Sequence, residues 1–168
     1  MFKIGDYVVN SKNGVCLIED IQKMNFSGTE KEYYLLIPLQ EKNAKLYIPV
    51  NTASQRVRLA MNSEQALSFI NEIKDIEKLS ILNDKDRENV YKDILKSCDP
   101  KAIVSIIKTL YVRRQNRLNE GKKNTTVDEH YFKIAENHLY GELSFALQIS
   151  KEEVIQMIIK NIESTDET

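Results

Sequence analysis

Basic side chains are concentrated in the stretch TLYVRRQNRLNEGKK, residues 109–123. The residues that carry them are Arg113, Arg114, Arg117, Lys122 and Lys123. Guanidinium and ammonium groups at this density can neutralise phosphates, and arginine also offers a planar pair of donors. The same residue types are common on solvated helix faces and in ion pairs where helices pack. The stretch therefore indicates either a surface for a polyanion or a set of intramolecular ion pairs.

Charge is unevenly distributed along the chain, although the formal net charge is only -1. Residues 85–123 hold 11 basic and 5 acidic residues, which gives a local net charge of +6. Residues 127–168 hold 3 basic and 9 acidic residues, which gives a local net charge of -6. The sequence thus predicts a basic segment followed by an acidic one.

The composition is that of an ordinary globular protein. Its 168 residues are 42% hydrophobic and 29% charged, enough for one domain or two small ones. Lys3 and Asp6 interrupt the apolar run that a secretory signal needs, and no window is apolar enough for a membrane span. Cys16 and Cys98 do not form a disulfide framework or a CxxC site. We therefore expect a cytoplasmic protein with free thiols and no membrane contact.

Residues for enzymatic chemistry are sparse. The sequence has no GxGxxG, GxxxxGK[ST] or GxSxG motif, and Cys16 has no His in its half of the chain. His138 and Glu142 can share a metal on one helix face, but a third ligand at a suitable spacing is missing. We expect no enzymatic activity, no cofactor, no metal and no small-molecule substrate.

Hydrophobic periodicity divides the chain into two halves. Between residues 7 and 49, short apolar runs rich in Val, Ile and Tyr predict four or five strands in a small antiparallel barrel or sandwich. Beyond Val57, apolar residues recur three and four positions apart, which predicts helices. The expected helices span residues 63–73, 84–95, 100–118, 128–147 and 152–162. The expected fold class is α+β, with a β domain over residues 1–53, a join over residues 51–62 and an all-α bundle over residues 60–168.

Helix start signals support the helical half of this prediction. N-cap side chains accept hydrogen bonds from free backbone N–H groups, and proline is favoured in the first turn. The expected caps are Ser63, Asn83, Asp99 followed by Pro100, Thr126 with Glu129, and Ser150 with Glu153.

The basic stretch continues the apolar face of the helix expected over residues 100–118. At about 100° per residue, Arg114 and Arg117 fall in the arc that holds Ile106 and Leu110. They are therefore not on the solvated face. Either the helix end projects past the core and presents its arginines, or the arginines pair with the acidic helices that follow.

Short motifs follow one another through the strand half. They run from Gly5-Asp6 through Ile18-Glu19 and Tyr33-Tyr34 to Ile48-Pro49. LKSCDPKAIVSIIKTLYVRR and AENHLYGELSFAL follow in the helical half. This ordered set resembles the CarD/CdnL family of bacterial transcription regulators. The resemblance implies a Tudor-like barrel that binds the β subunit of RNA polymerase, and a helical domain that contacts promoter DNA at the upstream edge of the transcription bubble.

A polymerase-binding surface is the first site that the resemblance implies. It would comprise edge strands of the Tudor- or SH3-like barrel, because an exposed edge is a template for pairing with another chain. The implied residues are Met24, Asn25 and Phe26 on one side and Lys45, Tyr47 and Ile48 on the other. Without the resemblance, Phe26, Tyr47 and Ile48 read as half-buried barrel residues.

Promoter DNA is the second implied partner, contacted weakly and mainly through its phosphates. The candidate residues are Lys85, Arg87, Lys92, Arg113, Arg114, Arg117, Lys122 and Lys123. Many family members carry a Trp that wedges against the minor groove, and the best alignment places Asp84 there in a chain without Trp. A carboxylate at this position repels phosphates, so Asp84 itself should oppose DNA binding.

These observations predict a regulator that bridges RNA polymerase and promoter DNA and modulates open complexes. It would be associated with the nucleoid through RNA polymerase. The alternative is a protein–protein adaptor, in which the β domain binds polymerase or another partner and the acidic C-terminal helices act without DNA. Neither interpretation requires catalysis.

Overall fold

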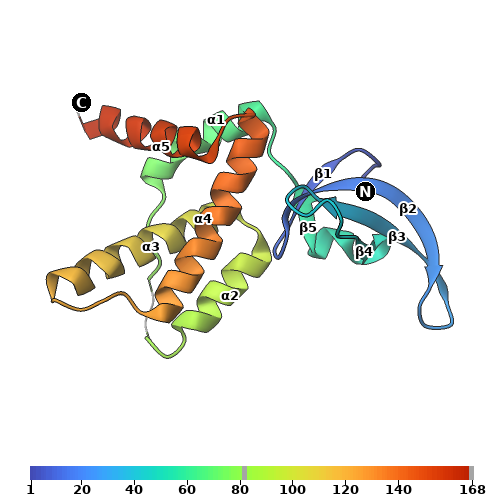
Figure 1. Ribbon diagram of the computed structural model, residues 1–168, viewed down its shortest axis with the longest axis horizontal. Coiled ribbons are helices and arrows are strands. Elements are labelled where there is room, and N and C mark those ends of the chain that lie inside the picture. The colour runs from blue at the N-terminus through green and yellow to red at the C-terminus, as the bar shows by residue number, and fades with distance from the viewer. Residues whose placement is uncertain (81–82, 167–168) are drawn as a thin grey trace. The chain divides into compact units, whose positions relative to one another are not determined.

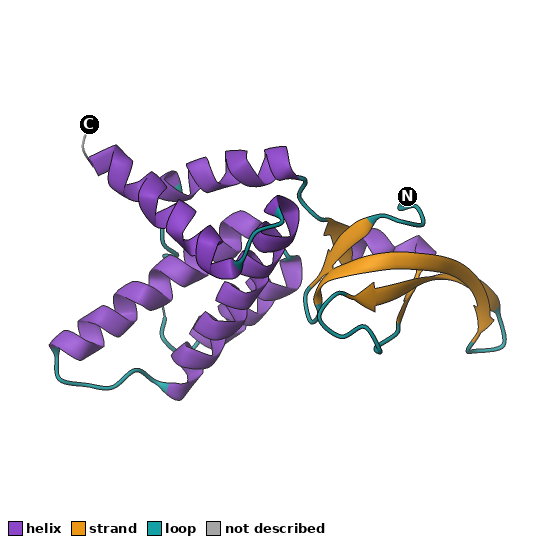
Figure 2. Cartoon of the chain, turned by 45° about the horizontal axis from the view of Figure 1, so that its top comes forward, coloured by secondary structure: helices purple, strands orange, loops and turns teal. Residues whose placement is uncertain are grey.

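A computed structural model describes residues 1–80 and 83–166 (Figure 1). The chain divides into two compact units, Met1–Ala60 and Met61–Thr168. Each unit has its own cluster of buried apolar side chains. The first contains the strands and the second contains the long helices (Figure 2). The change from strands to helices is as predicted, but the first unit extends past residue 53.

The N-terminal unit is an antiparallel sheet of five strands in the order β4-β3-β2-β1-β5. The strands are β1 (Tyr7–Asn10), β2 (Gly14–Asn25), β3 (Glu30–Pro38), β4 (Leu46–Pro49) and β5 (Val57–Leu59). β4 and β5 stand at opposite ends of this order. The predicted antiparallel β domain is confirmed, whereas the pairing among the described residues is that of an open sheet and not of a closed barrel.

The N-terminal unit is longer than predicted because two residues of the expected join, Ala53 and Val57, belong to the sheet core. A short 3-10 helix, Val50–Gln55, carries the chain from β4 to β5, and its Ala53 is buried in the sheet core. Val57 follows on β5, where it is also buried and pairs with Asn10 of β1. Three residues are too few for a periodicity argument, so the sequence analysis assigned β5 to the join.

The β2–β3 hairpin continues beyond the part of the sheet that includes β1. β1 pairs with β2 only as far as Leu17, whereas β3 pairs with β2 as far as Asn25. The register shifts between Ile18 and Asp20, the position of a bulge. Figure 1 shows the resulting long, curved hairpin.

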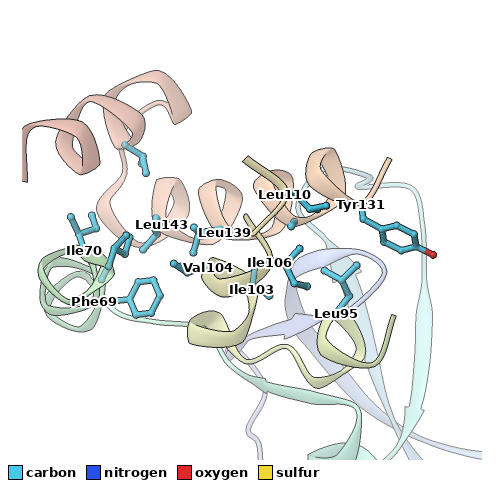
Figure 3. Close-up of a cluster of buried hydrophobic side chains, with 14 of the residues drawn as sticks. Phe69, Ile70, Leu95, Ile103, Val104, Ile106, Leu110, Tyr131, Leu139 and Leu143 are labelled. Carbon is cyan, nitrogen blue, oxygen red and sulfur yellow. The ribbon is translucent and has the colours of Figure 1, made fainter. Parts of the chain in front are cut away.

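The C-terminal unit contains the five predicted helices. They are α1 (Ser63–Glu72), α2 (Arg87–Ser97), α3 (Pro100–Asn119), α4 (Thr126–Leu147) and α5 (Lys151–Asp166). Ile106 and Leu110 of α3 pack with Leu139 and Leu143 of α4 in one buried cluster (Figure 3). Within the described residues, none of the helices combines the length and apolar character needed to span a membrane.

Two of the predicted helix starts are confirmed. Asp99 accepts a hydrogen bond from the N–H of Lys101, with Pro100 in the first turn of α3. The capping box before α5 is complete, because Ser150 and Glu153 each accept a hydrogen bond from the backbone N–H of the other.

Three predicted helix starts were wrong by a few residues. Asn62 rather than Ser63 caps α1, and Thr125 rather than Thr126 caps α4. In both helices the earlier residue takes the extended conformation that an N-cap requires, so its oxygen reaches the free N–H. Asn83 closes a turn with the N–H of Lys85, and α2 begins only after that turn.

Candidate polymerase and nucleic-acid interfaces

β4 supplies one candidate surface, because it stands at one end of the strand order. Its inner edge pairs with β3 through four residues, from Leu46 to Pro49. Lys45 just before the strand is exposed, and Tyr47 is 36% exposed. Ile48 is only 5% exposed and belongs to the sheet core, so its side chain is not available to a partner. The accessible part of this candidate set is therefore Lys45, Tyr47 and the backbone of the outer edge.

Met24, Asn25 and Phe26 lie at the far end of the β2–β3 hairpin. Phe26 is 63% exposed, and its ring meets Tyr33 edge to face at 5.2 Å between centroids. Tyr33 in turn pairs with Pro49 of β4. Both candidate polymerase-binding sets therefore lie beside β3, but Met24 and Asn25 pair with its start whereas Tyr47 and Ile48 pair with its middle.

The basic candidates include two arginines that share one buried carboxylate. Arg87 Nη2 lies 3.1 Å from Asp128 Oδ1, and Arg113 Nε donates to Asp128 Oδ2 at 3.1 Å. Asp128 is fully buried in the first turn of α4. Its N–H is held by Thr125, which fixes the helix start from which the carboxylate points. The three side chains tie the beginning of α2, the second half of α3 and the beginning of α4 together.

Asp84 lies outside this group, in the turn that precedes α2. Its Oδ1 is 3.7 Å from Nη1 of Arg87 and 3.8 Å from Nη1 of Arg113. The sequence analysis placed Asp84 in the first helical turn, but the helix starts three residues later at Arg87. The position that aligns with the family's Trp therefore lies in a turn and not in a helix.

The other arginines of the basic stretch also make contacts within the helical unit. The guanidinium of Arg114 lies over two rings, 4.9 Å from the centroid of Phe132 and 5.7 Å from the centroid of Tyr111. Arg117 Nε donates to the backbone oxygen of Lys123 at 2.8 Å. Arg113 and Arg114 thus interact with α4, which agrees with the second alternative for this stretch.

The lysine candidates are more widely spread. Lys122 pairs with Glu120 at 3.4 Å, and Lys92 pairs with Glu88 at 3.6 Å. Lys85 is exposed in the turn before α2. Ion pairs between exposed side chains contribute about 0–1 kcal/mol, so they compete only weakly with an external anion.

Tyr91 adds a buried phenol near the arginine–aspartate group. The pKa of Tyr91 is raised to about 12, chiefly by burial and also by the charge of Asp128, while the charges of Arg87 and Arg113 oppose the rise. The phenol is therefore neutral at physiological pH. This part of the unit offers charge and hydrogen bonds to a ligand but no poised acid or base.

The possible metal pair on α4 has a structural role. Glu142 is buried, and its Oε2 accepts a hydrogen bond from the N–H of Met61 at 2.9 Å. The described residues contain no group of three or more His, Cys, Asp or Glu side chains that could hold a metal ion. Glu142 therefore secures the start of the helical unit.

An apolar groove of about 1020 Å³ runs along α3, α4 and α5. Ile107, Tyr140 and Ile158 are among its lining residues. Lys108 closes one side, where its Nζ donates to the backbone oxygens of Ile73 and Ile76 at 2.5 Å each. Burial lowers the pKa of Lys108, and nearby Asp75 opposes that change. The sequence analysis did not identify this groove, because its wall combines residues from four separate segments.

These features define a class of protein in which a small β domain with open edges is followed by a helical unit whose arginine and lysine side chains are largely paired within the unit. Residues 2–60 match the family model of the CarD-like/TRCF RID domain. The N-terminal unit is thus similar to the RID domains of this family, and the match bears out the predicted resemblance to CarD/CdnL proteins over these residues. A domain of this type indicates a transcription-associated protein that interacts with RNA polymerase. Among curated proteins, none matches the chain.

Proposed function

We propose that the chain binds the β subunit of RNA polymerase through the outer edge of β4 and contacts promoter DNA through its helical unit. Contact near the upstream edge of the transcription bubble would then change the stability of open complexes. The observation that carries the polymerase contact is an open β4 edge, with Lys45 and Tyr47 exposed, in a domain of the RID family.

Pairing of strands across the interface is the simplest way to use this edge. Its backbone N–H and C=O groups can add a strand from the partner, and the flanking side chains can supply specificity. Phe26 follows β2, and its ring contacts that of Tyr33 on β3, so the two rings supply apolar area beside the edge. We propose Met24, Asn25 and Phe26 as the second part of the polymerase-binding surface.

The DNA contact is proposed for the basic residues at the α2 and α3 end of the helical unit. Arg87 and Arg113 are oriented by Asp128, and Lys85, Lys122 and Lys123 are exposed nearby in sequence. Because several of these cations already have carboxylate partners, the contact should be weak and sensitive to salt. Phosphate contacts of this kind carry little sequence information.

Those internal ion pairs also favour the second candidate function, a polymerase-bound adaptor without a DNA contact. Arg87, Arg113, Lys92 and Lys122 all have an acidic partner within 4 Å. If these pairs persist in the promoter complex, the helical unit presents little net positive charge at this end. The two functions share the polymerase contact and differ in the role of the helical unit.

The β4 edge can be tested by substituting Tyr47 in the full chain. We expect Tyr47→Asp to lower the affinity for RNA polymerase about 30-fold, since burying an unpaired charge at an interface costs about 2 kcal/mol or more. Leu59→Asp is the matched control, because Leu59 is a 56% exposed apolar residue on β5 at the other end of the strand order. Biolayer interferometry on immobilised polymerase measures both.

Circular dichroism of each variant verifies that the fold is retained. Unchanged binding by folded Tyr47→Asp removes β4 from the proposal. An equal loss for Leu59→Asp would show that the effect does not belong to the β4 edge.

A further inference from the structure

Two arginine side chains direct their Nη1 groups towards a single point at the surface of the helical unit. That point is occupied by Asp84 Oδ1, which is 3.7 Å from Arg87 Nη1 and 3.8 Å from Arg113 Nη1. The Asp84 side chain is 85% exposed, whereas those of Arg87 and Arg113 are 15% and 29% exposed. An exposed carboxylate therefore lies over two largely buried guanidinium groups.

The inner carboxylate differs from the outer one in its geometry. Asp128 meets Arg87 Nη2 and Arg113 Nε at 3.1 Å each and is fully buried. Charge-assisted N–H···O bonds are usually about 2.7–2.9 Å long, so the Asp84 contacts are loose and the Asp128 contacts are close to bonding distance. Asp128 thus fixes the orientation of both arginines, and Asp84 can leave without disturbing them.

The charges of the four side chains cancel while Asp84 is in place. Two guanidinium groups face two carboxylates, and departure of Asp84 leaves one positive charge that is accessible from solvent. A phosphodiester carries one negative charge and has oxygens that match the donors of two arginines. A phosphate oxygen is therefore chemically suited to the position that Asp84 Oδ1 holds between the two arginines.

We propose that Arg87 and Arg113 form a binding site for a backbone phosphate of DNA, and that Asp84 occupies this site in the free protein as an internal competitor. The proposal rests on the proposed DNA contact and assigns to it one site and one means of restraint. Because an exposed ion pair contributes about 0–1 kcal/mol, phosphate displaces Asp84 at a small cost. The restraint lowers the affinity for DNA in the absence of polymerase.

Removal of the competitor provides the test. We expect Asp84→Asn in the full chain to bind a fluorescein-labelled 20-base-pair duplex about three- to fivefold more tightly than the wild type at low salt. Asp86→Asn is the matched control, since it makes the same charge change two residues away, in the same turn, at an exposed side chain. The gain in duplex affinity of Asp86→Asn should be clearly smaller than that of Asp84→Asn. Fluorescence anisotropy gives the three dissociation constants.

Arg113→Gln tests whether the gain in duplex affinity of Asp84→Asn depends on the arginine pair. In combination with Asp84→Asn it should return duplex affinity to the wild-type value or below. Arg113→Lys serves as a second variant, because it keeps the charge beside Asp128 and loses the planar fork. Equal gains for Asp84→Asn and Asp86→Asn, or a gain that survives both Arg113 substitutions, would overturn the proposal.

Inorganic phosphate tests the site independently of DNA. Its titration is followed through the arginine Nε–Hε NMR signals of Arg87 and Arg113, and saturation should require less phosphate in Asp84→Asn than in the wild type. If phosphate does not distinguish the two proteins, the site itself is refuted. If phosphate distinguishes them and no variant binds the duplex, the proposed DNA contact fails, and with it the assignment of DNA as the ligand.

Discussion

Replacement of Asp128 by Ala is expected to lower the free energy of unfolding of the helical unit by about 3–5 kcal/mol. The substitution leaves Arg87 and Arg113 without their shared buried partner, and only the exposed Asp84 remains beside them. Removal of one member of a buried ion pair costs much more than the pair contributes, because the remaining charge stays desolvated. The contacts between α2, α3 and α4 that meet at Asp128 are lost together.

Urea unfolding of the full chain measures this loss of unfolding free energy. Circular dichroism at 222 nm follows the helices and therefore the helical unit. Asp84→Ala is the control, and it should cost less than about 1 kcal/mol because the same arginines meet Asp84 only at the exposed surface. A cost below 1 kcal/mol for Asp128→Ala would show that the buried carboxylate does not hold the three helices together.

The second large effect is expected from Asp84→Trp in the promoter complex. An aromatic side chain that stacks on a base contributes about 1–3 kcal/mol. If about half of that energy is gained, the lifetime of open complexes formed with this protein increases about two- to tenfold. The substitution also removes the carboxylate that repels phosphates. Asp84→Asn removes only the carboxylate, so its effect should be smaller than that of the aromatic substitution.

Decay of open complexes after a heparin challenge measures these lifetimes, with polymerase affinity determined separately for each variant. The double variant Arg113→Ala with Arg114→Ala should shorten the lifetime, since it removes two cations from α3. An unchanged lifetime for Asp84→Trp, with a shorter one for the arginine variant, would mean that the wedge position is misaligned. No effect from either would favour the adaptor function.

Much of the fold could be predicted because its periodicities are local. Strands rich in Val, Ile and Tyr and helices with apolar residues three and four apart are visible in short windows. β5 was missed because its three residues are too few to show a period, and its pairing with β1 bridges almost fifty positions of the sequence. The predicted caps of α1 and α4 were each one residue too late, because Asn62 and Thr125 are followed by residues of similar type that can play the same role.

The candidate DNA site could be predicted in composition but not in geometry. Arg87 and Arg113 were identified by charge alone, and their convergence depends on the packing of three helices. Asp128 was read as the start of an acidic helix and was not singled out as the partner of the arginines, although its position in the first turn was a usable signal. Ile48 was assigned to the interface by resemblance, whereas the alternation of side chains along β4 turns it into the core.

The central claim is that the RID unit alone supplies the contact with RNA polymerase. The direct measurement compares fragment 1–60 and fragment 61–168 in binding to immobilised polymerase. Each fragment contains a complete buried cluster, and fragment 1–60 keeps β5, which a fragment ending at residue 53 would lose. We predict that fragment 1–60 binds with nearly the affinity of the full chain and that fragment 61–168 does not bind. Binding by folded 61–168, with none by folded 1–60, would contradict the account.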